Sequence, residues 1–190
     1  MMGDFPWGID GPPFSGSRLG PSWFVVGEGV PGMAVSTVDA ELCIPVGKDF
    51  TVAMMLAHAP VDAVILWLGI NDCEATFHKN AEDITTALEQ SIEHIHAKSS
   101  QTAVILVAFS RVRDISDSAL NDMFLEATEK MCLAHNLKAL AQELHTEFID
   151  MNDWVETSIS DGIHLDEKSL EYVACVFSEM IRKQRMVDYT

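Results

Sequence analysis

The stretch VDAVILWLGINDC, residues 61–73, decides the fold of this chain. Its apolar run has no polar alternation, which is typical of a central strand in a parallel α/β sheet, buried on both faces. The run ends at Gly69, and Asn71 and Asp72 follow at once. Because ligands bind at the carboxyl ends of strands in open sheets, we expect these two side chains to lie at the functional site. A helix-capping turn is the alternative interpretation.

The rest of the chain alternates between predicted strands and helices. Further apolar runs predict strands at 23–28, 103–109 and 148–149. Amphipathic patterns predict helices over 49–58, from the N-cap Asn80 to about Lys98, within 118–144 with a break near His135 and Asn136, and over 167–184. Residues 1–22, rich in glycine and proline, are expected to form loops. The order predicts one three-layer α/β domain over residues 1–190, with parallel strands and right-handed crossovers.

The composition argues against several classes of partner. Twelve Lys and Arg against 29 Asp and Glu give a formal net charge of -17, which repels nucleic acid and anionic membrane surfaces. The sequence has no signal-peptide pattern and no apolar run near the roughly 20 residues of a membrane span, so we expect a cytoplasmic protein. The cysteines lack paired or metal-ligand spacing and are expected to be reduced thiols: Cys43, Cys73, Cys132 and Cys175.

A second segment whose residues could take part in catalysis is SDGIHLD at 160–166, before the last predicted helix. A histidine three residues after an aspartate can turn its imidazole back toward the carboxylate. Asp161 would then fix the tautomer of His164 and stabilise its imidazolium, which is the orienting half of a catalytic triad. Because the pattern is short, an Asp-Gly turn with a histidine at the sheet edge is the structural alternative.

Three short segments follow predicted strands in the order and approximate spacing of one known family. They are GVPG at 29–32, GIND at 69–72 and DGIH at 161–164. From about Leu19 to the carboxyl end, the chain resembles the SGNH (GDSL) hydrolases, and within them the arylesterase-like branch. The resemblance implies a flavodoxin-like sheet and serine-dependent hydrolysis of small acyl or aryl esters, with no cofactor.

The same resemblance implies a role for each motif residue. Gly32 would offer a backbone N–H and Asn71 a side-chain amide to an oxyanion hole, where one donor is worth on the order of 3 kcal/mol of barrier. His164 would be the general base and Asp161 its orienting partner. Asp72 is expected to hold its loop through local backbone hydrogen bonds.

The nucleophile of the family is missing from its expected place. The family presents its serine in a Gly-Asp-Ser segment after its first strand, and the nearest match here is GDFPWG at 3–8. One alignment puts Phe5 in the place of the serine, and a shift by one residue puts Asp4 there. Three serines lie nearby, but none follows a strand or a sharp turn that would expose a nucleophile: Ser15, Ser17 and Ser22.

The first strand and first helix of the family also lack counterparts, because GDF is preceded by two methionines and GPPFSGSR replaces the helix. A buried unpaired backbone group costs roughly 1 to 3 kcal/mol, so a missing central strand must be replaced. Either the natural chain starts upstream of Met1, or residues 1–8 close the gap, or a partner chain adds a strand, as in a homo-oligomer.

Two functions therefore stay open at this point. The first is an SGNH esterase of small acyl esters, and the second is a catalytically silent SGNH-like module that holds a ligand with Asn71 and His164. A metal site is not expected, since His94 and His96 stand two apart on a predicted helix and face different directions.

Overall fold

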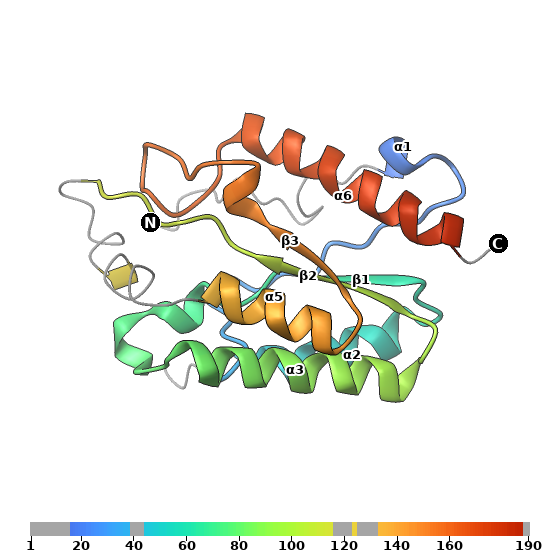
Figure 1. Ribbon diagram of the computed structural model, residues 1–190, viewed down its shortest axis with the longest axis horizontal. Helices are drawn as coiled ribbons and strands as arrows, with labels where there is room; N and C mark the ends of the chain where they lie inside the picture. The colour runs from blue at the N-terminus through green and yellow to red at the C-terminus, as the bar shows by residue number, and fades with distance from the viewer. Residues whose placement is uncertain (1–15, 39–43, 116–122, 125–132, 188–190) are drawn as a thin grey trace. The chain divides into compact units, whose positions relative to one another are not determined.

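The computed structural model describes residues 16–38, 44–115, 123–124 and 133–187. The chain divides into two compact units, one made of residues up to Gly29 and from Leu165 onward, the other of Val30–His164. The second unit holds the sheet, which Figure 1 shows together with the helices that pack on it. It also contains Gly32, Asn71, Asp161 and His164.

In the part of the chain that the structure describes, the sheet has three parallel strands in the order β1-β2-β3: β1 (Ala63–Leu66), β2 (Ala103–Ala108) and β3 (Glu147–Asp150). Ala63 pairs with Ala103 in the first ladder, and Ile105 pairs with Glu147 in the second. All of β2 after Ala103 is buried. The predicted parallel α/β sheet is confirmed, and its centre is β2.

β1 is an edge strand in the described part of the chain, which corrects the expectation that residues 61–73 supply the central strand. Only Leu66 of its four residues is buried, and the other three are partly exposed. An apolar run predicts that other elements cover both faces of a strand. It does not predict whether another strand pairs with either of its edges. The predicted strand is therefore confirmed, and among the described residues it pairs on one side only, with β2.

The predicted strand at 23–28 is wrong. This run in the first unit forms no strand, and the side chain of Phe24 is 90% exposed. Apolar residues favour a strand only where a ladder partner and a covering layer exist. The first unit contains instead α1 (Gly16–Leu19), where a loop was expected, and α6 (Glu167–Val187), which confirms the predicted closing helix.

Three helices of the second unit lie on one side of the sheet (Figure 1): α2 (Gly47–Ala57), α3 (Ala81–Lys98) and α5 (Leu133–Glu143). α5 runs on through 135–136, so the predicted break there is wrong. Its buried leucines at 133, 137 and 140 hold the helix against the core, which overrides the weak helix propensity of the two polar residues. Residues 116–122 and 125–132 of the predicted helix lie outside the described residues.

α3 forms as the sequence predicts. The Asn80 side chain accepts a hydrogen bond from the Asp83 N–H at 2.9 Å, and the Asp83 carboxylate accepts one from the Asn80 N–H at 3.1 Å. This capping box satisfies backbone donors at the helix start. The apolar face of α3 is fully buried in the core: Ile84, Leu88, Ile92 and Ile95.

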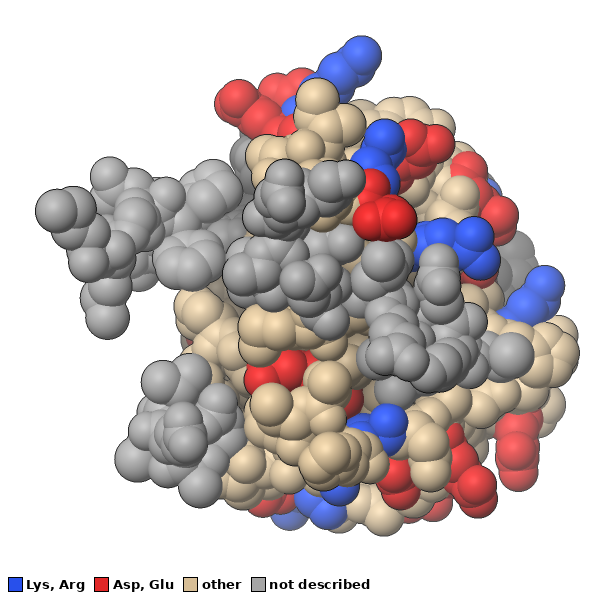
Figure 2. Space-filling view, turned by 90° about the vertical axis from the view of Figure 1, so that its left-hand side faces the viewer, with Lys and Arg blue, Asp and Glu red and all other residues tan. Residues whose placement is uncertain are grey.

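Two features of the whole chain follow from its composition. Acidic side chains are spread over the face in Figure 2, in keeping with the formal net charge of -17. Within the described ranges, every helix is too short or too polar to cross a membrane.

Candidate functional site

After β1 the chain passes through Gly69, whose backbone conformation no other residue type adopts easily. Gly69 has a φ of +114°, and a Cβ at this position would lie 3.2 Å from the Ile84 side chain on α3. Glycine therefore permits both the turn and the close approach of the helix. Directly after it the chain forms a short 3-10 helix, Asn71–Cys73.

Asp72 is a buried anchor for a distant loop. Its side chain is 0% exposed, and its carboxylate oxygens accept hydrogen bonds from the backbone N–H groups of Val35 and Ser36, each at 2.7 Å. A holding role was expected for Asp72, but the bonds reach 37 and 36 residues back along the chain rather than to local backbone. Residues 33–36 are thereby fixed beside the end of β1.

Asn71, the residue before Asp72, contacts the same loop at Met33. Its Nδ2 donates a hydrogen bond to the carbonyl oxygen of Met33 at 3.0 Å. Because Met33 follows Gly32, the structure brings together the two residues predicted to supply oxyanion donors. An amide nitrogen carries two N–H groups, and no described residue accepts the second one.

Gly32 lies in a tight turn, and its backbone N–H has no partner among the described residues. The Met33 N–H donates to the Val30 carbonyl oxygen at 3.1 Å and closes the turn, in which Pro31 is followed by Gly32 with a φ of +78°. Proline and then glycine at these positions are typical of a type II turn. No described residue accepts a hydrogen bond from the Gly32 N–H, which leaves it open to another acceptor.

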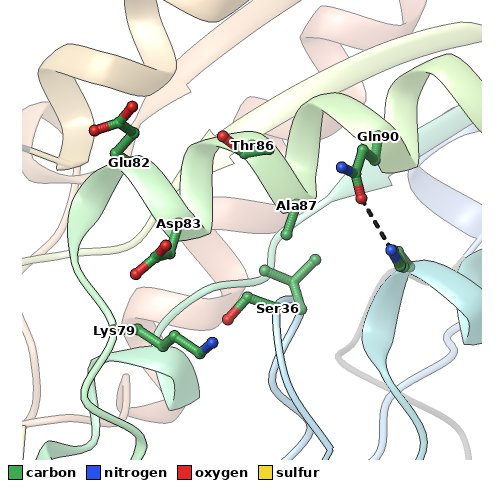
Figure 3. A pocket seen from close by; sticks show the side chains of 9 residues that line it. Ser36, Lys79, Glu82, Asp83, Thr86, Ala87 and Gln90 are labelled. Carbon is green, nitrogen blue, oxygen red and sulfur yellow. Dashed lines mark hydrogen bonds between the residues drawn. The ribbon is translucent and has the colours of Figure 1, made fainter.

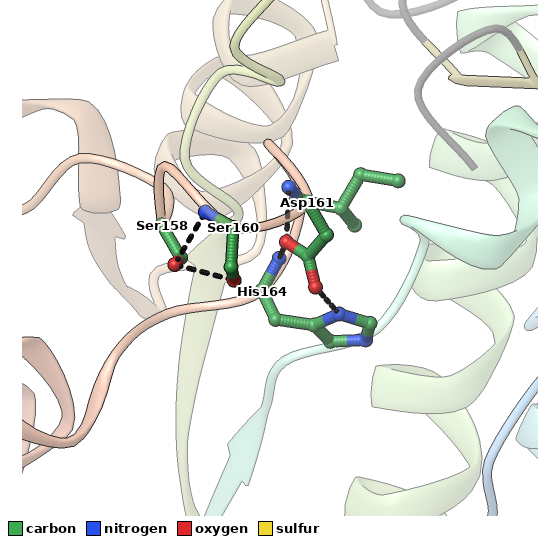
Figure 4. Close-up of polar contacts among 5 residues, drawn as sticks. Ser158, Ser160, Asp161 and His164 are labelled. Atoms are coloured by element: carbon green, nitrogen blue, oxygen red, sulfur yellow. Dashed lines mark hydrogen bonds and ion pairs between the residues drawn. The ribbon is translucent and has the colours of Figure 1, made fainter. Parts of the chain in front are cut away.

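Asp161 and His164 form a close pair in the loop after β3 (Figure 4). The ring Nδ1 of His164 lies 2.7 Å from Oδ2 of Asp161, and Oδ1 accepts hydrogen bonds from the N–H groups of Ile163 at 2.9 Å and His164 at 3.0 Å. An ionised carboxylate accepts, so the proton of the neutral ring lies on Nδ1 and Nε2 keeps a lone pair. No described residue bonds to Nε2, and the His164 side chain is 44% exposed.

The surroundings of Asp161 favour its ionised form. Burial raises the pKa of the carboxyl, but the hydrogen bonds from Ile163 and His164 and the charge of the imidazolium outweigh burial and hold the pKa below its usual value. The carboxylate therefore stays charged at neutral pH and can stabilise an imidazolium at His164.

Backbone contacts hold this loop in place. The Arg113 N–H donates to the Gly162 carbonyl oxygen at 2.8 Å, and the Ser158 N–H donates to the His164 carbonyl oxygen at 2.7 Å. The Arg113 guanidinium also pairs with Glu156 at 2.5 Å. Sequence reasoning missed Arg113 and Glu156, and no signal could have found them, since the pair joins residues 43 apart with no motif between them.

Three described serines lie after the strands that lead to the site. Ser158 and Ser160 share a hydrogen bond between their hydroxyls at 2.8 Å, and Figure 4 shows both on the side of the loop away from the imidazole. Ser110, just after β2, is 4% exposed, and its Oγ has no described partner. Sequence reasoning missed Ser110, although a polar residue just past a buried strand is the same signal that identified Asn71.

Other predicted residues fall elsewhere. Phe5 and Asp4, the residues at the expected serine position, lie outside the described residues, as does Ser15. Ser22 is an exposed residue of the first unit. Among the residues that the structure describes, no group of three or more His, Cys, Asp or Glu side chains is placed to hold a metal ion.

A hollow of about 280 Å³ lies between the loop at 35–36 and the first turns of α3 (Figure 3). Lys48 on its rim donates to Gln90 at 2.9 Å. None of the four predicted site residues lines this hollow, which is formed by Val35, Ser36, Lys48, Lys79, Glu82, Asp83, Thr86, Ala87 and Gln90.

The loop after β1 and the loop after β3 both lie at the end of the sheet toward which the strands run (Figure 1). Ile70 and Ile163, the neighbours of Asn71 and His164, pack against the same hydrophobic core. One end of the sheet therefore carries open hydrogen-bond donors and a base paired with a carboxylate. Such groups can stabilise a developing oxyanion and move a proton.

The fold is similar to that of two solved esterase structures. The inhibitor-bound aryl esterase of M. smegmatis is similar with a TM-score of 0.84 and 22% sequence identity over 94% of each chain. A carbohydrate acetylesterase from Sinorhizobium meliloti is similar with a TM-score of 0.81 and 23% identity over 88% of this chain and 81% of the other. These likenesses establish the SGNH-hydrolase fold and confirm the predicted fold class.

The family follows from the sequence itself. The model of the GDSL-like lipase/acylhydrolase family matches residues 15–169, which is most of the chain. This chain therefore belongs to the GDSL-like lipase/acylhydrolase family, as its motifs predicted. A comparison with curated proteins found no match.

Proposed function

We propose that this chain hydrolyses small, uncharged acyl esters at the carboxyl end of its sheet. The observation that carries the proposal is the 2.7 Å contact between Asp161 and His164, in a ring whose Nε2 has no hydrogen-bond partner among the described residues. Membership of an acylhydrolase family supports the same reaction class. The site is built from residues of one compact unit, Val30–His164.

In this proposal each candidate residue has one catalytic role. His164 takes a proton from the attacking nucleophile and later gives it to the leaving alcohol. Asp161 holds the ring and stabilises the imidazolium while remaining ionised. The Gly32 N–H and the second N–H of Asn71 donate to the carbonyl oxygen as it becomes an oxyanion.

Charge and the structural relatives together indicate the substrate class. A formal net charge of -17 disfavours anionic esters, which would be repelled as they approach. Two similar structures are those of an aryl esterase and a carbohydrate acetylesterase. Acetyl esters of phenols and of sugars are therefore the first substrates to test.

Hydrolysis of p-nitrophenyl acetate by the purified chain and by His164→Ala tests this function. We expect a saturable rate that falls by about 100-fold or more in the variant, since a positioned general base contributes roughly 10² to 10⁴. His94→Ala is the matched control, because His94 is an exposed residue of α3, and it should retain the full rate. A rate that stays at background, or one that His164→Ala leaves unchanged, would refute the proposal.

One feature of the sequence favours a second function, that of a binding module without turnover. In the two alignments to the family motif, Phe5 or Asp4 stands where the family presents its serine. A module of this kind would bind an acetyl ester or its product carboxylate without turnover, and it would keep part of its affinity when His164 is replaced. Isothermal titration with acetylated sugars separates it from the esterase, since an esterase would release acetate during the titration.

A further inference from the structure

We propose that the hollow beside α3 is a binding site for one neutral sugar or a similar small polyol. The hollow lies between the loop at 35–36 and the first turns of α3, and none of the four predicted site residues lines it. It belongs to the same compact unit as those residues, Val30–His164. The proposed site is therefore separate from the groups assigned to catalysis, and the inference does not depend on the proposed esterase function.

The floor of the hollow is apolar and of the size of one sugar ring. It is formed by two buried side chains, Val35, which is 0% exposed, and Ala87, which is 7% exposed. The volume of about 280 Å³ is near the lower limit of small-ligand pockets, roughly 300 Å³. Such a floor can pack against the C–H face of one ring, while the volume leaves no room for a chain of sugars.

The polar groups around this floor can both donate and accept hydrogen bonds. Lys48 Nζ donates to Gln90 Oε1 at 2.9 Å, and no described residue accepts the remaining N–H groups of these two side chains. Figure 3 shows Gln90 at one end of the hollow and Ser36, Lys79 and Asp83 at the other. A ring that carries hydroxyls on both sides could therefore bond to both ends.

Two of the polar groups lack partners within the described part of the protein. The Ser36 hydroxyl is buried and has no hydrogen-bond partner there. The Lys79 ammonium makes no ion pair or hydrogen bond to a described residue, although Glu82 and Asp83 line the same hollow. Buried polar groups in proteins are nearly always hydrogen-bonded, so a ligand hydroxyl at this end of the hollow would supply the missing partner.

The charges of the hollow balance, which favours a neutral ligand. Lys48 and Lys79 carry positive charge, and Glu82 and Asp83 carry an equal negative charge. An anionic ligand would in addition be repelled by the formal net charge of -17. A hydroxyl group donates and accepts hydrogen bonds without carrying charge, so a polyol matches this mixed lining.

Both walls of the hollow are fixed by hydrogen bonds of the protein itself. The backbone N–H groups of Val35 and Ser36 donate to the Asp72 carboxylate, each at 2.7 Å. The first turn of α3 is held by the capping box between Asn80 and Asp83. Because the walls are preformed, a ligand does not have to order a loop when it binds.

Titration of the full, ¹⁵N-labelled chain with glucose, galactose and xylose, followed through backbone amide resonances, tests this inference. We expect saturable shifts at Ser36, Ala87 and Gln90 for at least one of the sugars, with a Kd on the order of 1 mM. The absence of shifts with all three sugars, or shifts confined to Asn71 and His164, would overturn the inference. Tighter binding of glucuronate than of the neutral sugars would overturn the assignment of an uncharged ligand.

Substitutions in the hollow give a second test. Lys79→Met should weaken binding about tenfold, because a hydrogen bond from a charged donor is lost. Gln90→Met removes the partner of Lys48 and should weaken binding as well. Lys98→Met is the matched control, since Lys98 is an exposed residue of α3 outside the hollow, and it should bind as the unaltered chain does. Equal affinities of all three variants would show that the sugar binds elsewhere and would refute the site.

Discussion

The Asp161 carboxylate is held by several hydrogen-bond partners at once. One oxygen receives two backbone N–H groups and the other receives the imidazole of His164. The three hydrogen bonds keep the carboxylate charged despite its burial and fix the ring in one orientation. A residue that looks like an ordinary Asp-Gly turn in sequence is therefore equipped to support a base.

Replacement of Asp161 by asparagine should reduce kcat/KM on p-nitrophenyl acetate by about 100-fold or more. The amide keeps the shape of the carboxylate but cannot stabilise an imidazolium, and it favours the wrong tautomer of the ring. The measurement is a steady-state rate at neutral pH. Asp153→Asn, at an exposed position, should match the unaltered chain; equal rates for both variants would exclude a role for Asp161.

Asp161 should also stabilise the fold in a pH-dependent manner. Because its pKa is lowered in the folded state, its contribution is fully present above the unfolded pKa of about 3.9 and is lost as the pH falls through the folded pKa. In urea unfolding, the free energy difference between the unaltered chain and Asp161→Asn should stay constant from neutral pH to about pH 5 and shrink in more acidic solution. A difference that grows with acid would contradict this sign.

At the residue scale, motifs could nominate the candidate groups but could not predict the atoms that hold them in place. Gly32, Asn71, Asp161 and His164 were all predicted from short segments, and the last two lie close enough in sequence for their contact to be anticipated. The bond from Asn71 to the Met33 carbonyl oxygen spans 38 residues. Such a contact depends on how the chain packs, and no local pattern encodes it.

Among the elements, the link between β1 and the loop at 33–36 matters most for the site. The Asp72 carboxylate satisfies two backbone N–H groups of that loop in a fully buried position. The strand therefore delivers an anchor for the turn that carries Gly32, in addition to delivering Asn71.

Asp72→Ala should lower the free energy of unfolding by on the order of 3 kcal/mol, because it leaves both N–H groups without a partner in the protein interior. Urea denaturation measures the loss. Asp62→Ala is the matched control, since Asp62 is exposed at the start of β1, and it should change stability by less than about 0.5 kcal/mol. Equal stability of the two variants would show that the Asp72 bonds contribute nothing.

The sequence predicted most of the helices and parallel strands. It did not predict which strands pair side by side in the sheet. The N-cap of α3 could be found because the capping box is local, and β2 because its apolar run is complete. The run at 23–28 has the composition of a strand but forms none, and β1 lies at an edge of the described sheet. Pairing depends on what the rest of the chain supplies, which a short window of sequence does not contain.

For the molecule as a whole, the excess of acidic residues should select among esters by charge. With a formal net charge of -17, an anionic ester is repelled at low ionic strength and less so when salt screens the field. We therefore expect kcat/KM for an anionic acetyl ester to rise between about 10 mM and 300 mM salt, while that for p-nitrophenyl acetate changes little. A fall for the anionic ester would point to a local cationic site instead.

The central claim is that residues from distant parts of the chain, Asn71 and His164, act on one transition state. A double-mutant cycle of kcat/KM on p-nitrophenyl acetate, with Asn71→Ala, His164→Ala and both together, tests it most directly. Each single variant should lose about 100-fold or more, and the double variant should lose little beyond His164→Ala, because groups that serve one transition state are not additive. Losses that simply multiply, or an Asn71→Ala variant with full activity, would contradict a shared site.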